Sequence, residues 1–532
     1  MTFSRPNRSD ATKTRTRVQA APISGICVTC LDGCPGTCEI GRSAIRGRET
    51  IYPQPFGKVT AGADKDYPID YSHFNIQGTC VGAVGVAPDP DVATFPAVDC
   101  ATALGADGSI KLSFPVFTGA VGSTDVARVN WDEVAIGAAI SGIMVIAGEN
   151  VCGMDPNAEF QNGRVVKSPE MERRVSAHRQ WFDGTGGIVI QANVEDTKLE
   201  VPEYVIEKLG IEIFELKWGQ GAKDIGGEVQ LETLDRAKQL RERGYIVLPD
   251  PHNPVAQKSF EMGAIDKFER HSRLGMVDEE AFYAAVEHLR SLGAKYVTLK
   301  TGAYRPADLA RALKFSSRAK IDLLTIDGAG GGTGMSPWRM MNEWGIPTVY
   351  LQCLTYQMCE RLAAQGEYVP PIAMAGGFSL EDHLFKAIAL GAPYVKAVCL
   401  GRAILTAGMV AKNQGKKALE NGKNPEDAYL SLFAVGAQLK DRFGGDFTKI
   451  PAGAIGVYSY VDRLRQGLQQ LMAGARKFAL NYVDRGDLVA LTRDAAEISG
   501  IPYVMESDAD EIDRILGSDT KVQGIGYRKL SN

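Results

Sequence analysis

Residues 323–334 read LLTIDGAGGGTG, an apolar run of strand length that ends in a loop with five glycines. Because glycine has no Cβ, such a loop can adopt positive φ angles and present bare peptide N–H groups to a planar or anionic ligand. A tight turn is the plainer interpretation of the same pattern. Two further strand-to-glycine junctions follow, at residues 372–377 (IAMAGG) and 395–402 (VKAVCLGR). The repetition indicates several strand ends gathered around one ligand, as at the mouth of a barrel.

Strand and helix patterns alternate from residue 112 onward, which predicts a parallel α/β architecture. The eight strand candidates are 112–118, 142–147, 187–192, 211–217, 294–300, 321–326, 370–375 and 394–400. Helical patterns lie between several of them, at 230–243, 278–292, 306–318 and 379–390. Glycine or polar residues end most of the strands, which favours a closed (β/α)8 TIM barrel over a doubly wound open sheet. Short apolar runs at 245–248 and 346–351 are then excursions from the barrel.

The barrel is predicted to occupy residues 111–412. Residues 1–20, rich in Thr, Ser and Arg, are expected to be a disordered tail, and residues 21–110 an irregular cysteine-rich segment laid over the barrel. Residues 413–532 are expected to form a mainly helical extension. Its clearest amphipathic stretch, 461–472, is predicted to pack outside the barrel or at a subunit interface of a homo-oligomer.

Composition narrows the class of partner. The chain has 532 residues, 45% of them hydrophobic, and a net charge of −5, so nothing indicates a nucleic-acid or membrane-surface partner. No apolar run approaches the roughly 18 residues that a membrane span needs. The N-terminus lacks the apolar core of a secretion signal, although its composition leaves an organellar transit peptide open. We therefore expect a cytoplasmic protein.

Four of the ten cysteines form a separate N-terminal group with the spacing C-x2-C-x3-C-x3-C: Cys27, Cys30, Cys34 and Cys38. Four thiolates within twelve residues can converge on one centre, and an iron–sulfur cluster is the favoured interpretation. A structural zinc ion uses similar spacings, and independent thiols remain a third alternative. Four further cysteines lie in apolar contexts and are predicted to be buried core residues: Cys152, Cys353, Cys359 and Cys399.

Several motifs, in order, now support a family resemblance. They are FTGAVG at 117–122, ELKWGQGAK at 215–223, TLK at 298–300 and DGAGGGTGMSP at 327–337. The segment from about 112 to 412 resembles the FMN-binding synthase domain of the glutamate synthase family. The resemblance implies an FMN-binding TIM barrel that acts as an oxidoreductase of amino-acid metabolism.

The resemblance implies which residues hold FMN. Strand-end N–H groups and one guanidinium would bind the phosphate, and the flavin ring would lie against small residues. These residues are Gly119, Ala120, Gly330, Gly331, Gly332, Gly376, Gly377, Gly401 and Arg402. Gln191 is expected to bond the pyrimidine edge, and Lys300 to face the flavin N1 region, where a cation stabilises the reduced form. Alternatives are a helix-capping Arg402, an ordinary polar strand end at Gln191 and a rim lysine at Lys300.

Further residues are candidates for the substrate and for proton transfer. Lys217, Gln220 and Lys223 would hold the carboxylates of a 2-oxo or 2-imino acid, or else form a charged solvated loop. Glu149 and Asp327 are acid–base or orienting groups at strand ends, or alternatively helix caps.

The implied reaction is hydride transfer from reduced FMN to a 2-imino acid such as 2-iminoglutarate. Electrons would arrive through the iron–sulfur cluster from ferredoxin or a reductase subunit. The sequence begins Met1-Thr2-Phe3 without the family's glutaminase domain, so we expect ammonia from solution or from a separate glutaminase subunit. The family's cysteines after the barrel are missing at 403–408, and the N-terminal four are expected to replace them. Residues 224–228 (DIGGE) also depart from the family, which leaves two alternatives open: another small amine or oxo acid as substrate, or an FMN-binding electron-transfer subunit.

Overall fold

The fold is described from a computed structural model. It describes residues 32–34, 36, 38–46, 66–219, 229–263, 265, 268–331, 344–422 and 424–517. Among these, no helix is long and apolar enough to cross a membrane.

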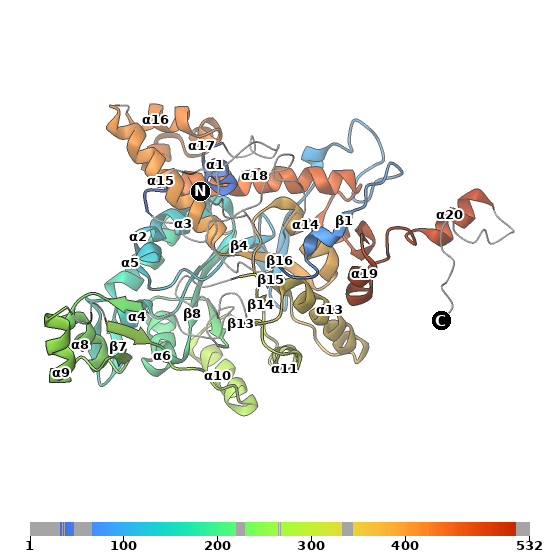
Figure 1. The fold of residues 1–532 in the computed structure, drawn as a ribbon. Coiled ribbons are helices and arrows are strands. Elements are labelled where there is room, and N and C mark those ends of the chain that lie inside the picture. Colours follow the sequence, from blue (N-terminus) through green and yellow to red (C-terminus); the bar gives the residue numbers. More distant parts are fainter. Residues whose placement is uncertain are drawn as a thin grey trace.

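Eight parallel strands close into a barrel, which excludes the open-sheet alternative and confirms the predicted (β/α)8 class (Figure 1). In chain order the strands are β4 (Val116–Thr118), β5 (Met144–Ala147), β8 (Gly187–Ala192), β9 (Ile213–Lys217), β13 (Tyr296–Thr301), β14 (Leu324–Asp327), β15 (Ile372–Ala375) and β16 (Val395–Leu400). Each falls on one of the eight predicted segments. Strand β16 pairs with β4, and this contact closes the ring.

The first predicted strand, 112–118, is partly wrong. Its beginning belongs to β3 (Ile110–Leu112), which forms an antiparallel hairpin with β2 (Thr102–Leu104). Leu104, Ile110 and Leu112 pack against the apolar side chains inside the barrel, including Phe117. The hairpin therefore closes the N-terminal end of the barrel and forms its floor. Pro115 lies between β3 and β4, so its missing N–H interrupts no hydrogen-bonded strand pair.

Helices cover the outside of the barrel. They include α3 (Trp131–Ser141), α5 (Pro169–Arg179), α10 (Glu279–Leu292), α11 (Pro306–Arg318), α13 (Thr348–Ala364), α14 (Glu381–Gly391) and α15 (Arg402–Glu420). The apolar run at 346–351 is the beginning of α13. The run at 245–248 is an excursion, as predicted: β11 (Ile246–Leu248) joins β10 (Val229–Leu231) and β12 (Phe268–His271) in a small sheet outside the barrel.

The predicted amphipathic stretch 461–472 lies in α18 (Ala452–Gly474), but it is not a surface helix. Helix α18 packs on α3, α14 and α15, and also on α1 (Glu39–Arg46) of the N-terminal segment. Polar as well as apolar residues of this stretch are buried, among them Asp462 and Arg463. Neighbours on several sides, rather than on one stripe, decide this burial, and Arg463 is compensated by an ion pair with Glu381.

The N-terminal and C-terminal segments meet outside the barrel. Strand β1 (Phe74–Ile76) pairs antiparallel with β17 (Leu488–Ala490), two strands separated by more than four hundred residues. The four interior cysteines are buried as predicted.

Candidate functional site

The C-terminal ends of two neighbouring barrel strands hold a buried ion pair. Lys300 of β13 places its Nζ 3.0 Å from Oδ2 of Asp327, the last residue of β14. Their side chains are only 10% and 12% exposed. Burial disfavours the charged lysine, but Asp327 opposes this and raises the pKa of Lys300 above its ordinary value. Lys300 is therefore a fixed cation inside the barrel mouth, which excludes the solvated rim position.

A second buried pair lies at the next strand end. Nζ of Lys217, the last residue of β9, lies 2.8 Å from Oε1 of Glu149, which follows β5. The Lys217 side chain is 4% exposed, so it is not part of a solvated loop. Burial opposes ionisation of Glu149, yet the Lys217 ammonium holds the pKa of this carboxyl below its usual range. Glu149 is thus a carboxylate at neutral pH.

Glu215 is a buried residue to which the sequence analysis gave no role. It lies two positions before Lys217 on β9 and therefore shares its face of the strand. One carboxylate oxygen accepts from the Gln191 amide, and the other lies 3.5 Å from the Thr298 hydroxyl. Burial raises the pKa of Glu215, while Lys300 lowers it. The alternation of residues 215 and 217 on a predicted strand was the signal that could have identified it.

Gln191 lies at the heart of this polar layer. It is 1% exposed, and its Oε1 accepts no hydrogen bond within the described part of the chain. A buried amide oxygen without a donor is costly in a folded protein. The Gln191 Oε1 is therefore an acceptor that still lacks a hydrogen-bond donor among the described residues.

Glycines let two strand ends approach closely. A Cβ added to Gly119 would lie 2.8 Å from the Cα of Gly401 and 3.8 Å from the sulfur of Cys399. A Cβ added to Gly401 would instead meet no described atom within 4 Å. Thus Gly119 is required by the fold, whereas Gly401 borders open space. Ala120, beside Gly119, packs against the apolar barrel interior.

The loops after β14 and β15 meet at a second glycine contact. Gly376 and Gly377 have φ angles of 117° and 102°, which side chains rarely adopt. A Cβ on Gly376 would lie 2.8 Å from the backbone of Gly328, and one on Gly331 would lie 2.8 Å from Oδ1 of Asp327. Gly330 is buried between them. Close backbone packing therefore explains why Gly331 and Gly376 are glycines, as the tight-turn interpretation predicts.

Arg402 is the first residue of α15, directly after Gly401, and is half-buried. It therefore combines a guanidinium with the N-terminus of a 19-residue helix, where an anion is favoured.

Arg174 holds the loop after β4 through hydrogen bonds to its backbone. The sequence analysis did not identify this residue. It is 1% exposed and donates to the carbonyl oxygens of Val121 (2.8 Å) and Gly122 (3.0 Å). Its Nε donates to Glu170 at 2.8 Å, and its guanidinium lies over the Trp131 ring. These bonds fix the loop that contains Gly119 and Ala120.

Asp196 supports the loop that carries Glu149. Its Oδ2 accepts the backbone N–H of Asn150 at 2.9 Å, and Asn150 has a φ of 64°. Burial raises the pKa of Asp196 to about 7, because desolvation outweighs the hydrogen bonds. The sequence analysis missed Asp196 since it lies on helix α6 (Val194–Lys198) and reaches the site only through the fold.

Two of the four N-terminal cysteines are described. Cys38 is buried immediately before α1, and Cys34 is half-buried; their sulfurs accept the N–H groups of Gly41 and Gly36. No metal-binding group of three or more side chains occurs among the described residues. The remaining predicted site residues lie outside the described residues: Cys27, Cys30, Gln220, Lys223 and Gly332.

Residues 270–412 match the family described as the conserved region in glutamate synthase. The matched part spans the strand ends that carry Lys300, Asp327, Gly376 and Gly401. This part of the chain is therefore similar to the conserved region of glutamate synthases.

Curated proteins similar to this chain are matched over part of their length. The glutamate synthase large subunit-like protein YerD of Bacillus subtilis is 29% identical over 187 residues, 35% of this chain and 32% of that protein. The archaeal-type glutamate synthase [NADPH] of Thermotoga maritima is 29% identical over 197 residues, 36% of this chain and 34% of that protein. The chain thus covers about a third of the length of the curated relatives it matches.

Solved structures with a similar course of the chain are more distant. A mutant flavocytochrome b2 with pyruvate bound has a TM-score of 0.46 at 14% identity, covering 79% of this chain and 76% of that one. An IMP dehydrogenase/GMP reductase-like protein from Corynebacterium glutamicum has a TM-score of 0.41 at 12% identity, covering 78% and 92%. At these values the likenesses have no bearing on function.

Proposed function

We propose that this chain is a glutamate synthase-like, FMN-dependent oxidoreductase that reduces a small 2-imino acid such as 2-iminoglutarate. The observation that carries the proposal is the buried Lys300–Asp327 pair at the C-terminal mouth of a closed barrel, where TIM-barrel enzymes place their active sites. The family match over residues 270–412 covers this pair.

The surrounding residues fit FMN. The open space at Gly401, the Arg402 guanidinium and the N-terminus of α15 suit a phosphate group. The free Oε1 of Gln191 suits an N–H donor, which the pyrimidine edge of a flavin provides. Gly119 lets the backbone of the first strand end pack directly against Gly401, so that the two strand ends would form one continuous edge of the flavin site.

Bound FMN would supply a hydride to the imino carbon. Lys300 would hold a permanent positive charge near the cofactor, because Asp327 raises the pKa of Lys300 and the ion pair fixes its position. Lys217 would bind a substrate carboxylate, exchanging its present partner Glu149 for the ligand. Glu149, released from that pair and 24% exposed, would then be able to hold or move a proton at the substrate.

The position of the N-terminal cysteine segment supports a role in electron transfer. Gly36, between Cys34 and Cys38, lies against Val410 of α15, since a Cβ there would come within 2.5 Å of the Val410 side chain. Val410 is eight residues along the helix from Arg402, roughly 12 Å at 1.5 Å per residue. We therefore propose that the four cysteines bind an iron–sulfur cluster, which takes electrons from ferredoxin or a reductase subunit. The ammonia for the reaction would come from solution or from a separate glutaminase.

The cofactor is tested by adding FMN to the full chain, reconstituted anaerobically with iron and sulfide, and measuring flavin absorbance and affinity. Gly401→Ala should weaken FMN binding by about tenfold or more, because the methyl group occupies the open space proposed for the phosphate. The matched control is Gly445→Ala, another glycine with no described atom within 4 Å of an added Cβ, but in the remote helix η6 (Gly444–Lys449). Absence of bound flavin in the wild-type protein would refute the proposed function.

The substrate is tested separately. Reduced protein is mixed anaerobically with ammonium and 2-oxoglutarate, or with other small oxo acids, and flavin reoxidation is followed. Fastest reoxidation by an acid other than 2-oxoglutarate would retain the flavoenzyme and change its substrate. No reoxidation by any oxo acid, with FMN bound, would favour the electron-transfer subunit.

A further inference from the structure

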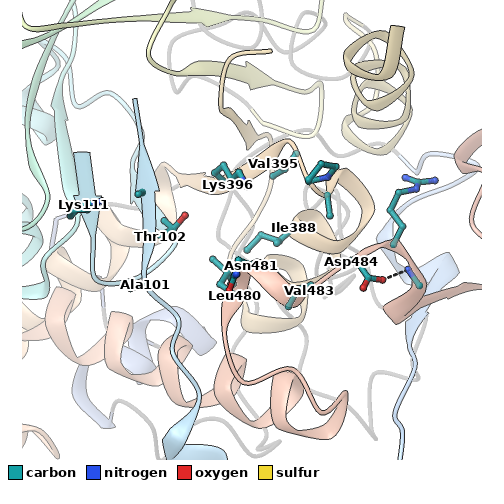
Figure 2. A pocket seen from close by; sticks show the side chains of 15 residues that line it. Ala101, Thr102, Lys111, Ile388, Val395, Lys396, Leu480, Asn481, Val483 and Asp484 are labelled. Atoms are coloured by element: carbon teal, nitrogen blue, oxygen red, sulfur yellow. Dashed lines mark hydrogen bonds between the residues drawn. The ribbon is translucent and has the colours of Figure 1, made fainter. Parts of the chain in front are cut away.

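A second cavity lies at the opposite end of the barrel from the proposed FMN site. It has a volume of about 710 Å³ and lies between three segments that are distant in sequence (Figure 2). These segments are the floor hairpin β2–β3, the connection from α14 to β16, and residues 480–486. Strand β16 begins at this cavity and ends beside Gly401. The cavity and the proposed FMN site therefore lie at opposite ends of one strand, five residue steps of roughly 3.3 Å apart.

One half of the cavity wall is apolar. It includes Ile388 of α14, Val395 of β16, and Leu480 and Val483 of the segment 480–486. A volume of several hundred cubic ångströms with such a wall is typical of pockets that hold small organic molecules.

Lys396, the second residue of β16, lines the cavity beside Val395 and is half-buried (Figure 2). It makes no hydrogen bond or ion pair with any described residue, and burial alone lowers its pKa. The buried lysines of the barrel mouth differ, because Lys300 and Lys217 each contact a carboxylate. A partly desolvated ammonium without an acceptor is unfavourable, and an anion in the cavity would relieve this cost.

The remaining charged groups leave the cavity positive. Lys111 of β3 donates only to the carbonyl oxygen of Gly108 among described residues. Arg485 is held by backbone carbonyls and lies over the Tyr356 ring. The single carboxylate of the wall, Asp484, is already engaged by Lys477 at 2.7 Å and by the N–H of Gly486 at 2.7 Å.

We propose that this cavity is a binding site for a small organic carboxylate with an apolar body, whose carboxylate pairs with Lys396 and whose body contacts Ile388 and Leu480. The proposal does not depend on FMN or on the reaction at the barrel mouth. It assigns the N-terminal end of β16 a ligand of its own.

Isothermal titration calorimetry of the full chain with octanoate tests the site, with octanamide as the uncharged probe of equal shape. Octanoate should bind the wild-type protein about tenfold to a hundredfold more tightly than octanamide does, the range of a charge-assisted hydrogen bond. Lys396→Met should remove this difference, while Lys449→Met, an exposed lysine on η6, should not. Ala101→Trp, at an exposed position of the wall, should weaken both probes by filling the cavity.

Folding of the variant is checked in the same samples. Lys396→Met should leave the melting temperature unchanged or raised without ligand, because it removes a cation that has no partner. Equal affinity of the wild-type protein for octanoate and octanamide, no binding of octanoate, or undiminished octanoate binding by folded Lys396→Met would each overturn the proposal.

Discussion

Replacing Lys300 with methionine keeps the length and apolar bulk of the side chain but removes its charge. The ammonium lies 3.0 Å from Asp327 in a site where both side chains are nearly buried. At an effective dielectric constant of about 20, the attraction at this distance is about 5 kcal/mol. Loss of one partner leaves the other charge uncompensated, so we expect the free energy of unfolding to fall by about 3–5 kcal/mol.

Urea unfolding with and without FMN measures this effect. The double variant Lys300→Met/Asp327→Asn should recover most of the lost stability, because a neutral amide replaces the unpaired carboxylate. The midpoint potential of bound FMN should be lower than in the wild-type protein in both variants, since neither has the cation. The double variant thereby separates the contribution of Lys300 to the fold from its contribution to the flavin.

The effect on the flavin is read from the midpoint potential and from the rate of flavin reoxidation. FMN should still bind through the phosphate loops, but with a lower potential. The lost charge should cost about 2–4 kcal/mol of transition-state stabilisation, or about two to three decades in rate. Unchanged potential and rate in a folded Lys300→Met protein would refute the assignment of this lysine to the flavin.

Two further predictions concern the second ion pair and its support. Glu149→Gln should lower the free energy of unfolding in urea more than Lys217→Met does. The lysine left behind in the first variant is 4% exposed, whereas the glutamate left behind in the second is 24% exposed and can be solvated. Equal decreases in the free energy of unfolding would contradict this prediction. Asp196 has a folded-state pKa of about 7, raised by burial above its unfolded value, so its stabilising contribution is greatest at low pH and falls as the pH rises from about 4 to about 7. Asp196→Asn should remove this slope, worth at most about 4 kcal/mol, and a wild-type minus variant difference that is flat with pH would show that Asp196 ionises normally.

Local sequence was sufficient to place the barrel strands. Each of the eight predicted strand segments overlaps a barrel strand, because side-chain periodicity and turn chemistry act within a few residues. The resemblance to the glutamate synthase family indicated Lys300, Gln191 and Lys217, and all three lie near the C-terminal ends of strands, which meet at one face of a barrel.

Other features required contacts between distant segments. Arg174 and Asp196 lie on helices and bond to loops about fifty residues away in the sequence, so their roles at the site arise from the fold. Lys396 reads as an ordinary polar residue in a strand until the segment 480–486 is folded beside it.

The sequence by itself determined the order and type of the barrel elements, because hydrophobic periodicity and backbone chemistry are local, and the family resemblance indicated residues at the barrel mouth. Only the tertiary structure decided which charges are paired, that 112 belongs to a floor hairpin, that α18 is buried on several sides, and that β1 pairs with β17. Pairing and burial depend on the free energy of the whole chain, in which distant segments compete for the same surfaces, and no local pattern records the outcome.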